Sequence, residues 1–489
     1  MLHERSGRRL GWMVTTAALP AVVVVILYAP ALRSAYRLDD LAWLSLRNTI
    51  ANGHSLVWAL FSPQAQGSIR PLGDRVWFLL ASSWFGLNPI PLHWLALITQ
   101  IANVFLLVAA GRRLLGSPVA AGIAATLWVL NDSLVEPLLW ASALNEVLYA
   151  FWFLLTFNAF MKWIDSGKSI WLGAHLAAMV LGFGTLELMV VFPLIAAVYI
   201  ALFAAGRWKA VLPSATVTVA FVAAHLFSVQ LPQSGPYRMS FGWSLVTNLA
   251  RYWTKVLGPE EYRGIHNSDA GLAMAGTVLM SAAVLAWVVA GLRRKQPAAL
   301  FCLLWFVLGL TPVLPLNEHF TPYYAFVPLI GLAWLAADAL VGAHSRFGRA
   351  VASACLILYA FCQAPSTLFV RDWNLARSAD VERREAQLAG AVREIRRIQP
   401  KGPVFLERLD TEQFWWGLCY GELIRQGYRD LHILPDAAAH GVAVPPSEWC
   451  LDPNFRLSTK ETALILGDDR GKAYDVGSLT PHAVLAKSR

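Results

Sequence analysis

Two adjacent carboxylates and an arginine stand near the start of this chain. Asp39 and Asp40 follow the first apolar run in RLDDLAWL, and Arg70 follows in SIRPLGDR. A carboxylate can take a proton from a hydroxyl group, and the planar fork of an Arg side chain matches the oxygens of a phosphate. The pattern therefore indicates a substrate that carries a phosphate. The alternative is an Arg–Asp ion pair that steadies the loop.

Further ionisable side chains interrupt stretches that are otherwise apolar. Glu136 lies in DSLVEPLLW, Glu146 in SALNEVLYA and Glu187 in GFGTLELMVVF. A carboxylate beside hydrocarbon is expensive, so each position is a candidate for a site. A helix cap is the alternative for all three. His319, in NEHFTPYY, is a second candidate contact for a phosphate or an acceptor, or else a hydrogen-bonded histidine at the membrane interface.

The elements that must position these residues are membrane helices. The chain has 489 residues, of which 57% are hydrophobic and 15% charged, whereas soluble domains have about 45–50% apolar and about 25% charged residues. Apolar runs of about 18–22 residues each suffice to cross roughly 30 Å of hydrocarbon as a helix. We expect an all-α polytopic membrane protein with about eleven spans, at 11–31, 91–111, 117–134, 146–163, 169–185, 188–205, 211–230, 270–291, 298–316, 323–342 and 348–366.

Basic residues between the runs predict the orientation of the chain. With the N-terminus in the cytoplasm, every cytoplasmic segment holds at least two Lys or Arg residues, as the positive-inside rule requires. They are Arg5, Arg8 and Arg9; Arg112 and Arg113; Lys162 and Lys168; Arg207 and Lys209; Arg293, Arg294 and Lys295; and Arg346 and Arg349. The net charge of +9 therefore indicates topology and not a nucleic-acid partner. The first run is read as a retained signal anchor, with a cleaved signal peptide as the alternative.

Composition also divides the chain. We expect a transmembrane domain over 1–366, with a first outer loop at 32–90, and an extracytoplasmic α/β domain over 367–489. Segments 74–86 and 241–257 are expected to be interfacial helices. Within the last domain, 377–398 and 411–426 are expected to be helical, and PVFLERL, DLHILPD and ETALILGDD to form strands.

In their order these motifs resemble the GT-C superfamily of glycosyltransferases, above all the protein O-mannosyltransferases and the tetratricopeptide-bearing transmembrane mannosyltransferases. The likeness covers about 36–330. The pair Asp39–Asp40 matches the family's acidic motif in the first outer loop, and IRPL (69–72) matches its RPL motif. EPLLWASALNEVLYAFWFLL places Glu136 and Glu146 in register with family acids, and LGFGTLELMVVFPLI does the same for Glu187.

The chain also departs from the family pattern. Asn131 and Asp132 stand where the family has His-Pro, Leu144 replaces an Arg, and Leu186 replaces a Lys. His319 stands where Arg is usual, and the short α/β region replaces the tetratricopeptide repeats.

The resemblance implies a hexosyltransferase of the plasma (inner) membrane that uses a polyprenyl-phosphate sugar donor, inverts the sugar and modifies a protein or cell-envelope glycan outside the cytoplasm. Asp39 or Asp40 would be the general base, Arg70 would hold the donor phosphate, and Glu136, Glu146, Glu187 and His319 would orient the substrates. The acids could hold a divalent cation, but no ligand spacing demands one. Two alternatives remain, a transporter or flippase for lipid-linked sugars and a non-catalytic scaffold of envelope glycan assembly.

Overall fold

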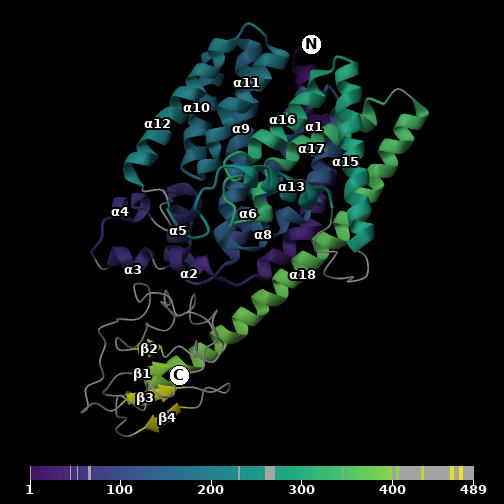
Figure 1. Cartoon of the computed structure of the whole chain (residues 1–489). Coiled ribbons are helices and arrows are strands. Elements are labelled where there is room, and N and C mark those ends of the chain that lie inside the picture. The colour runs from purple at the N-terminus through teal and green to yellow at the C-terminus, as the bar shows by residue number, and fades with distance from the viewer. Residues whose placement is uncertain are drawn as a thin grey trace. The chain divides into compact units, whose positions relative to one another are not determined.

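A computed structural model describes residues 2–44, 46–51, 53–63, 68–229, 232–258, 270–343, 345–398, 404–406, 431–433, 463–466 and 473–476 (Figure 1). The chain divides into two compact units. The first comprises Met1–Arg33, Leu60–Trp77 and Ile90–Leu375, and the second comprises Ser34–Ala59, Phe78–Pro89 and Ala376–Arg489. The expected domain boundary after 366 falls inside one unbroken helix, α18 (Arg346–Ile398).

The first unit is built from helices. Five of them carry Pro at the first or second position, where a backbone N–H would have no partner inside the helix. The helices are α1 (Leu2–Tyr28), α6 (Ile90–Leu115), α7 (Pro118–Val129), α8 (Val135–Leu139), α9 (Leu144–Ser166), α10 (Ser169–Phe183), α11 (Phe192–Phe203), α12 (Leu212–Ser228), α13 (Trp243–Leu257), α15 (Ala270–Arg293), α16 (Pro297–Leu310), α17 (Leu329–Val341) and most of α18.

Each of the eleven expected spans coincides with an apolar helix, but the helices differ in length. Six are long and apolar enough to cross a membrane, and a bent pair, Pro118–Val129 with Asp132–Leu139, makes a seventh. Four others, Ser169–Phe183, Glu187–Phe203, Pro297–Leu310 and Leu329–Val341, have 10–17 residues. The helices indicate a multi-pass membrane protein, while the count of eleven stays a prediction.

Several helices expose apolar side chains on their outer faces. Phe227 of α12 is 92% exposed, and Val278 and Leu285 of α15 are also exposed. Soluble monomers rarely expose contiguous apolar patches of more than a few hundred Å². These faces are suited to contact with lipid chains.

The centre of the first unit is an aromatic core around α9. Phe157 packs against Phe301 and Trp305 of α16, with ring centroids 5.8 and 5.0 Å apart. Trp305 in turn lies 5.1 Å from Trp334 of α17. Interlocked rings of this kind fill volume densely and fix the relative rotation of neighbouring helices. The first turn of α9, which contains Glu146, is therefore held by a rigid scaffold.

A sharp bend interrupts the segment expected to be one straight span at 117–134. The pair α7 and α8 is bent by 69° at 130–131. Asn131 has extended backbone angles, and its side-chain oxygen accepts a hydrogen bond from the backbone N of Ser133. Because this side chain caps the next turn, the helix restarts in a new direction at Asp132.

The second unit contains short helices and a small sheet. Its helices are α2 (Asp39–Leu44), α3 (Leu46–Ala51), and parts of α4 (Leu56–Phe61), α5 (Val76–Phe85) and α18. The backbone N of Ala35 donates to Ser378 Oγ at 2.5 Å, and the Tyr36 hydroxyl donates to the Asn88 carbonyl at 3.2 Å.

The four strands of this unit form one sheet in the order β2–β1–β3–β4. Three were expected from the sequence, namely β1 (Val404–Leu406), β2 (Leu431–Ile433) and β3 (Ala463–Leu466), and they pair in parallel. The fourth, β4 (Ala473–Val476), was not expected and pairs antiparallel to β3. The expected helix at 411–426 lies outside the described residues, and the extracytoplasmic placement of this region stays a prediction.

Candidate functional site

The turn Pro71–Arg75 fixes the position of Arg70. This π-helical turn docks on the end of α10, where the backbone N of Leu72 donates to the Gly184 carbonyl at 2.8 Å. A Cβ atom at Gly73 would lie 2.3 Å from the Thr185 carbonyl oxygen, so this close approach requires glycine. The docking brings Arg70 to Glu187, which begins the 3₁₀ turn Glu187–Val191 before α11.

Arg70 stands between two carboxylates. Its Nε lies 2.7 Å from Glu187 Oε2, and its Nη1 lies 3.8 Å from Asp74 Oδ2. The second oxygen of Asp74 accepts a hydrogen bond of 2.8 Å from the Asn145 amide. The Arg70 and Glu187 side chains are 25% and 22% exposed, whereas that of Asp74 is 3% exposed. The pair is therefore rigidly held and still accessible.

Arg75 supports the loop and adds a second cation. Its guanidinium donates to the carbonyls of Leu60 and Ser68 at 2.7 and 2.9 Å. These contacts hold the loop that carries Arg70. The positive charge of Arg75 also acts on Asp74, whose ionised form it favours.

Burial and neighbouring charges shift the pKa values of Arg70 and Asp74. Burial raises the pKa of Asp74 to about 7, although Arg70 acts in the opposite direction. Burial also lowers the pKa of Arg70, but Glu187 and Asp74 more than compensate, so this pKa lies above its ordinary value. Arg70 is therefore a permanent cation, while Asp74 exchanges its proton near neutral pH.

Two tyrosines of the 3₁₀ turn Pro322–Ala325 link Arg70 to the other acids. Burial raises the pKa of Tyr323, and nearby Glu136 and Glu146 raise it further. Burial likewise raises the pKa of Tyr324, with Arg70 opposing and Glu146 adding to the shift. Because such effects fall off with distance, the turn lies within the field of all three charged groups.

His319 is close enough to Arg70 to feel its charge. Its ring packs at a tilt of 34° against Tyr237, with centroids 4.3 Å apart, and its Nε2 lies 3.3 Å from Thr321 Oγ1. Burial lowers the pKa of His319, and the charge of Arg70 lowers it further. The imidazole is therefore neutral at pH 7 and can donate or accept a hydrogen bond.

Asp39 and Asp40 belong to the second unit, and within it they differ. Asp40 is buried, and its Oδ2 accepts a hydrogen bond of 2.8 Å from the backbone N of Arg37. The turn passes through Leu38, which has a φ of 52°. Asp39 is half-buried at the start of α2. Asp40 thus closes the turn, and Asp39 is the more accessible carboxylate.

The first unit therefore contains five of the seven residues expected in the site, namely Arg70, Glu136, Glu146, Glu187 and His319. Sequence reasoning assigned no role to Asn145 or to Tyr323 and Tyr324. The spacing of Arg70 and Asp74, four residues apart, and the YY of FTPYY were the available signals. Among the residues that the structure describes, no group of three or more His, Cys, Asp or Glu side chains is arranged to hold a metal ion.

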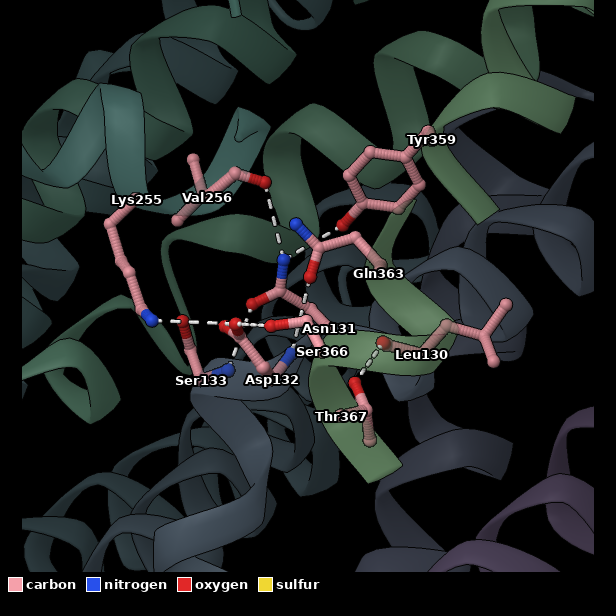
Figure 2. Close-up of polar contacts among 10 residues, drawn as sticks. All are labelled: Leu130, Asn131, Asp132, Ser133, Lys255, Val256, Tyr359, Gln363, Ser366 and Thr367. Atoms are coloured by element: carbon pink, nitrogen blue, oxygen red, sulfur yellow. Dashed lines mark hydrogen bonds and ion pairs between the residues drawn. The ribbon is translucent and has the colours of Figure 1, made fainter. Parts of the chain in front are cut away.

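A second ionic cluster lies where the sequence departs from the family's His-Pro. Lys255 Nζ lies 3.3 Å from Asp132 Oδ2, and the Ser366 hydroxyl donates to the same oxygen at 2.6 Å (Figure 2). The side chains of Lys255 and Asp132 are 1% and 0% exposed. This cluster joins α13, the bend before α8, and α18, and it is closed to solvent.

Neutral hydrogen bonds surround the Lys255–Asp132 pair (Figure 2). The Asn131 amide donates to the Tyr359 hydroxyl at 2.8 Å and to the Val256 carbonyl at 3.2 Å. The Thr367 hydroxyl donates to the Leu130 carbonyl at 2.6 Å. The cluster can therefore hold three segments together, but no substrate can reach it.

No family model matches this chain, and no curated protein matches it. Solved structures are similar to it. The apo form of the Archaeoglobus fulgidus oligosaccharyltransferase has 13% identity and a TM-score of 0.49, over 86% of this chain and 64% of that chain. The form tethered with an acceptor peptide has 17% identity and a TM-score of 0.45, over 74% of this chain and 55% of that chain.

ArnT from Cupriavidus metallidurans bound to undecaprenyl phosphate has 14% identity and a TM-score of 0.48, over 93% of both chains. This chain thus spans nearly the length of ArnT but less than two thirds of the oligosaccharyltransferase.

Proposed function

We propose that this chain is a membrane glycosyltransferase that moves a hexose from a polyprenyl-phosphate donor to a protein or a cell-envelope glycan outside the cytoplasm. The observation that carries the proposal is the accessible pair of Arg70 and Glu187 at one end of a bundle of apolar helices. A fixed guanidinium at such a place suits the phosphate of a lipid whose tail stays in the bilayer.

The reaction is a single displacement. The acceptor hydroxyl loses its proton to a carboxylate, and its oxygen forms a bond to the anomeric carbon as the bond from that carbon to the donor phosphate breaks. The electron pair leaves with the phosphate, whose developing charge Arg70 stabilises. Attack from the face opposite the leaving group inverts the anomeric centre.

Asp39 or Asp40 is the general base in this proposal, an assignment that rests on the sequence motif. The half-burial of Asp39 favours it as the residue that meets substrate, because an oxygen of Asp40 is engaged by the backbone N of Arg37. Glu187 aims the guanidinium of Arg70 through its 2.7 Å contact.

The remaining acids and His319 surround the acceptor side. Glu136 and Glu146 both act on Tyr323, and Glu146 also acts on Tyr324, so these two acids would orient the acceptor. The neutral imidazole of His319 would donate a hydrogen bond to the donor phosphate. In this proposal the site faces the outside of the plasma (inner) membrane, with the N-terminus in the cytoplasm and the C-terminal region outside.

The test measures donor cleavage. The purified full chain in liposomes is given polyprenyl-phosphate hexoses labelled in the sugar, and released or transferred label is counted. We expect Asp39→Asn, Asp40→Asn or both to abolish turnover, with Asp372→Asn as the matched control because Asp372 is 61% exposed and pairs only with neighbouring Arg371 among the described residues. Wild-type turnover in both aspartate variants would remove the assignment of the base.

Two other results would favour the alternative functions. Movement of the intact donor across the bilayer without cleavage would identify a transporter. If the folded wild type neither moves nor cleaves the donor, the result would favour a non-catalytic scaffold. Mass spectrometry of envelope glycans from cells with and without the protein then identifies the sugar and the acceptor.

A further inference from the structure

An open cavity lies between α6, α7, α9 and α10, and most of its wall is apolar. Its volume is about 910 Å³, and Phe105, Leu106 and Leu155 contribute to the lining. The Asn158 amide, also in the wall, donates to the Leu106 carbonyl at 3.0 Å and so ties α9 to α6. The cavity is therefore a fixed feature of the helix packing, and its surface is suited to hydrocarbon.

Basic side chains form one edge of this cavity. Arg112 and Arg113 come from the end of α6, and Lys162 comes from the last turns of α9. Arg113 forms an ion pair with the exposed carboxylate of Asp165, and Lys162 Nζ lies 4.1 Å from the centroid of the Trp171 ring. Three cations against one acid leave a net positive edge.

Arg112 is the cation of this edge with the most freedom to meet a ligand. It lines the cavity and is half-buried, and no ion pair to its guanidinium is found within the described ranges. Lys162 is exposed, and its contact with the face of the Trp171 ring is electrostatic. The three N–H donors of its ammonium group therefore remain available for hydrogen bonds. An anion at the edge would therefore meet two available cations.

The turn between α6 and α7 shapes the rim of the cavity. Gly116 has a φ of 70°, a left-handed conformation that favours glycine, and Pro118 begins the next helix. The Ser117 hydroxyl accepts a hydrogen bond of 3.2 Å from the backbone N of Ala120 and caps α7. The rim is thus set by its own backbone before any ligand arrives.

This edge lies far from the Arg70–Glu187 pair. Glu146 and Lys162 are 16 residues apart on α9, which corresponds to about 24 Å along the helix axis. The basic residues at this end are those that the positive-inside rule places in the cytoplasm. Anionic phospholipids are concentrated in that leaflet, and basic pockets between membrane helices on that side bind their head groups.

We propose that this cavity binds one anionic glycerophospholipid, with the phosphate between Arg112 and Lys162 and an acyl chain along the apolar wall. A soluble phosphate would leave the apolar wall in contact with water. A zwitterionic lipid would bring its own cation to an edge that is already positive. A polyprenyl phosphate carries the same phosphate group, so the experiment includes it as a separate probe.

The test is native mass spectrometry of the full chain in detergent, titrated separately with phosphatidylglycerol, phosphatidylcholine and a polyprenyl monophosphate. The variant Arg112→Gln/Lys162→Gln removes two cations from the edge. The control Lys168→Gln/Lys209→Gln removes the same charge from the same end of the bundle, at residues outside the lining. A third variant, Ala109→Phe, fills the wall without a change in charge.

We expect one phosphatidylglycerol per wild-type chain, bound at least tenfold more tightly than phosphatidylcholine. Each basic group near a lipid surface contributes about fivefold, so the variant without the two edge cations should bind roughly 25-fold more weakly. Ala109→Phe should also release the lipid, and the Lys168/Lys209 control should keep it. A circular-dichroism melt of each variant verifies that it is folded.

Three results would overturn the proposal. Equal affinity for phosphatidylcholine would remove the role of the charges. An equal loss in the Lys168/Lys209 control would reduce the effect to the general field of the basic end. Tight binding of the polyprenyl monophosphate alone would replace the glycerophospholipid with the donor lipid.

Discussion

Two ionic clusters of the first unit use the same chemistry in different surroundings. Arg70 and Glu187 lie 2.7 Å apart, with about a quarter of each side chain exposed. Lys255 and Asp132 lie 3.3 Å apart, and at most 1% of either side chain is exposed. We call the first pair the open pair and the second the sealed pair. Removal of two charges from water is expensive, so a member of the sealed pair cannot be lost without leaving the other buried and unpaired. A member of the open pair can exchange its partner for a ligand.

The sealed pair has a further partner, because the Ser366 hydroxyl donates a 2.6 Å hydrogen bond to Asp132 Oδ2. In the open cluster, the Arg70 and Glu187 side chains remain 25% and 22% exposed. The comparison separates a contact closed to solvent, which can hold the fold, from one that a ligand can reach.

The largest effect is expected in the sealed cluster. Asp132→Ala should lower the free energy of unfolding by about 3–5 kcal/mol, because it leaves the Lys255 ammonium buried without its carboxylate. The double variant Asp132→Leu/Lys255→Met should recover most of this loss. Apparent Tm in detergent gives the comparison, and a double variant as unstable as the sum of two single variants would contradict it.

The next effect belongs to the open cluster. Arg70→Ala should lower the rate of sugar transfer about 10²- to 10³-fold, the usual loss when a fixed donor to a developing anion is removed. Arg70→Lys should recover only part, because an ammonium cannot reproduce the fork of the guanidinium. Turnover of a labelled donor measures both. If Arg70→Ala instead unfolds the chain, the Arg70–Glu187 pair stabilises the fold, as the Lys255–Asp132 pair does.

A smaller effect concerns pH. The Asp74 carboxyl has a pKa of about 7 in the folded chain and 3.8 as its ordinary value. The folded state therefore binds more protons between about pH 4 and pH 7, and its stability should fall as pH rises through that window. Asp74→Asn should lack this fall, which amounts to a few kcal/mol. Parallel plots of Tm against pH for the two proteins would contradict the shift.

The smallest effect tests the support of the sealed pair. Ser366→Ala should lower the free energy of unfolding by about 1.5–3 kcal/mol, since it removes one hydrogen bond to the charged carboxylate of Asp132 and leaves the ion pair in place. Thr367→Val is the matched change at the neighbouring residue, whose hydroxyl donates to the Leu130 carbonyl. Thermal unfolding measures the loss of stability in both variants, and we expect a larger loss for Ser366→Ala, whose hydrogen bond goes to a charged acceptor. Equal losses would show that the charge adds nothing.

Much of the helical framework could be predicted from the sequence because run length and hydropathy are local properties. The expected strands at 404–406, 431–433 and 463–466 formed for the same reason, as short apolar segments between polar ones. β4 was not predicted because AYDV has only four residues and one of them, Asp475, is charged. The bend after α7 was not predicted because it depends on the buried side chain of Asn131, which a hydropathy plot counts only as one polar residue.

The contacts of the candidate site could be predicted only in part. The motifs drew attention to Arg70, Glu146 and Glu187 because charges in apolar stretches stand out. The pairing of Arg70 with Glu187 joins residues 117 positions apart, and that of Lys255 with Asp132 joins residues 123 apart. Distances of this kind are decided by helix packing and by close approaches such as Gly73 on Thr185. No local pattern encodes them.

One short helix of the first unit has a consequence for the surrounding lipid. α10 has 15 residues and exposes Ile170 and Val180, and its length corresponds to about 23 Å. Lipid chains that meet it must shorten to match. The membrane would be thinned beside this helix, so that the Thr185–Glu187 corner comes nearer to the headgroup layer. Bilayers of short acyl chains should therefore suit the protein better than thick ones.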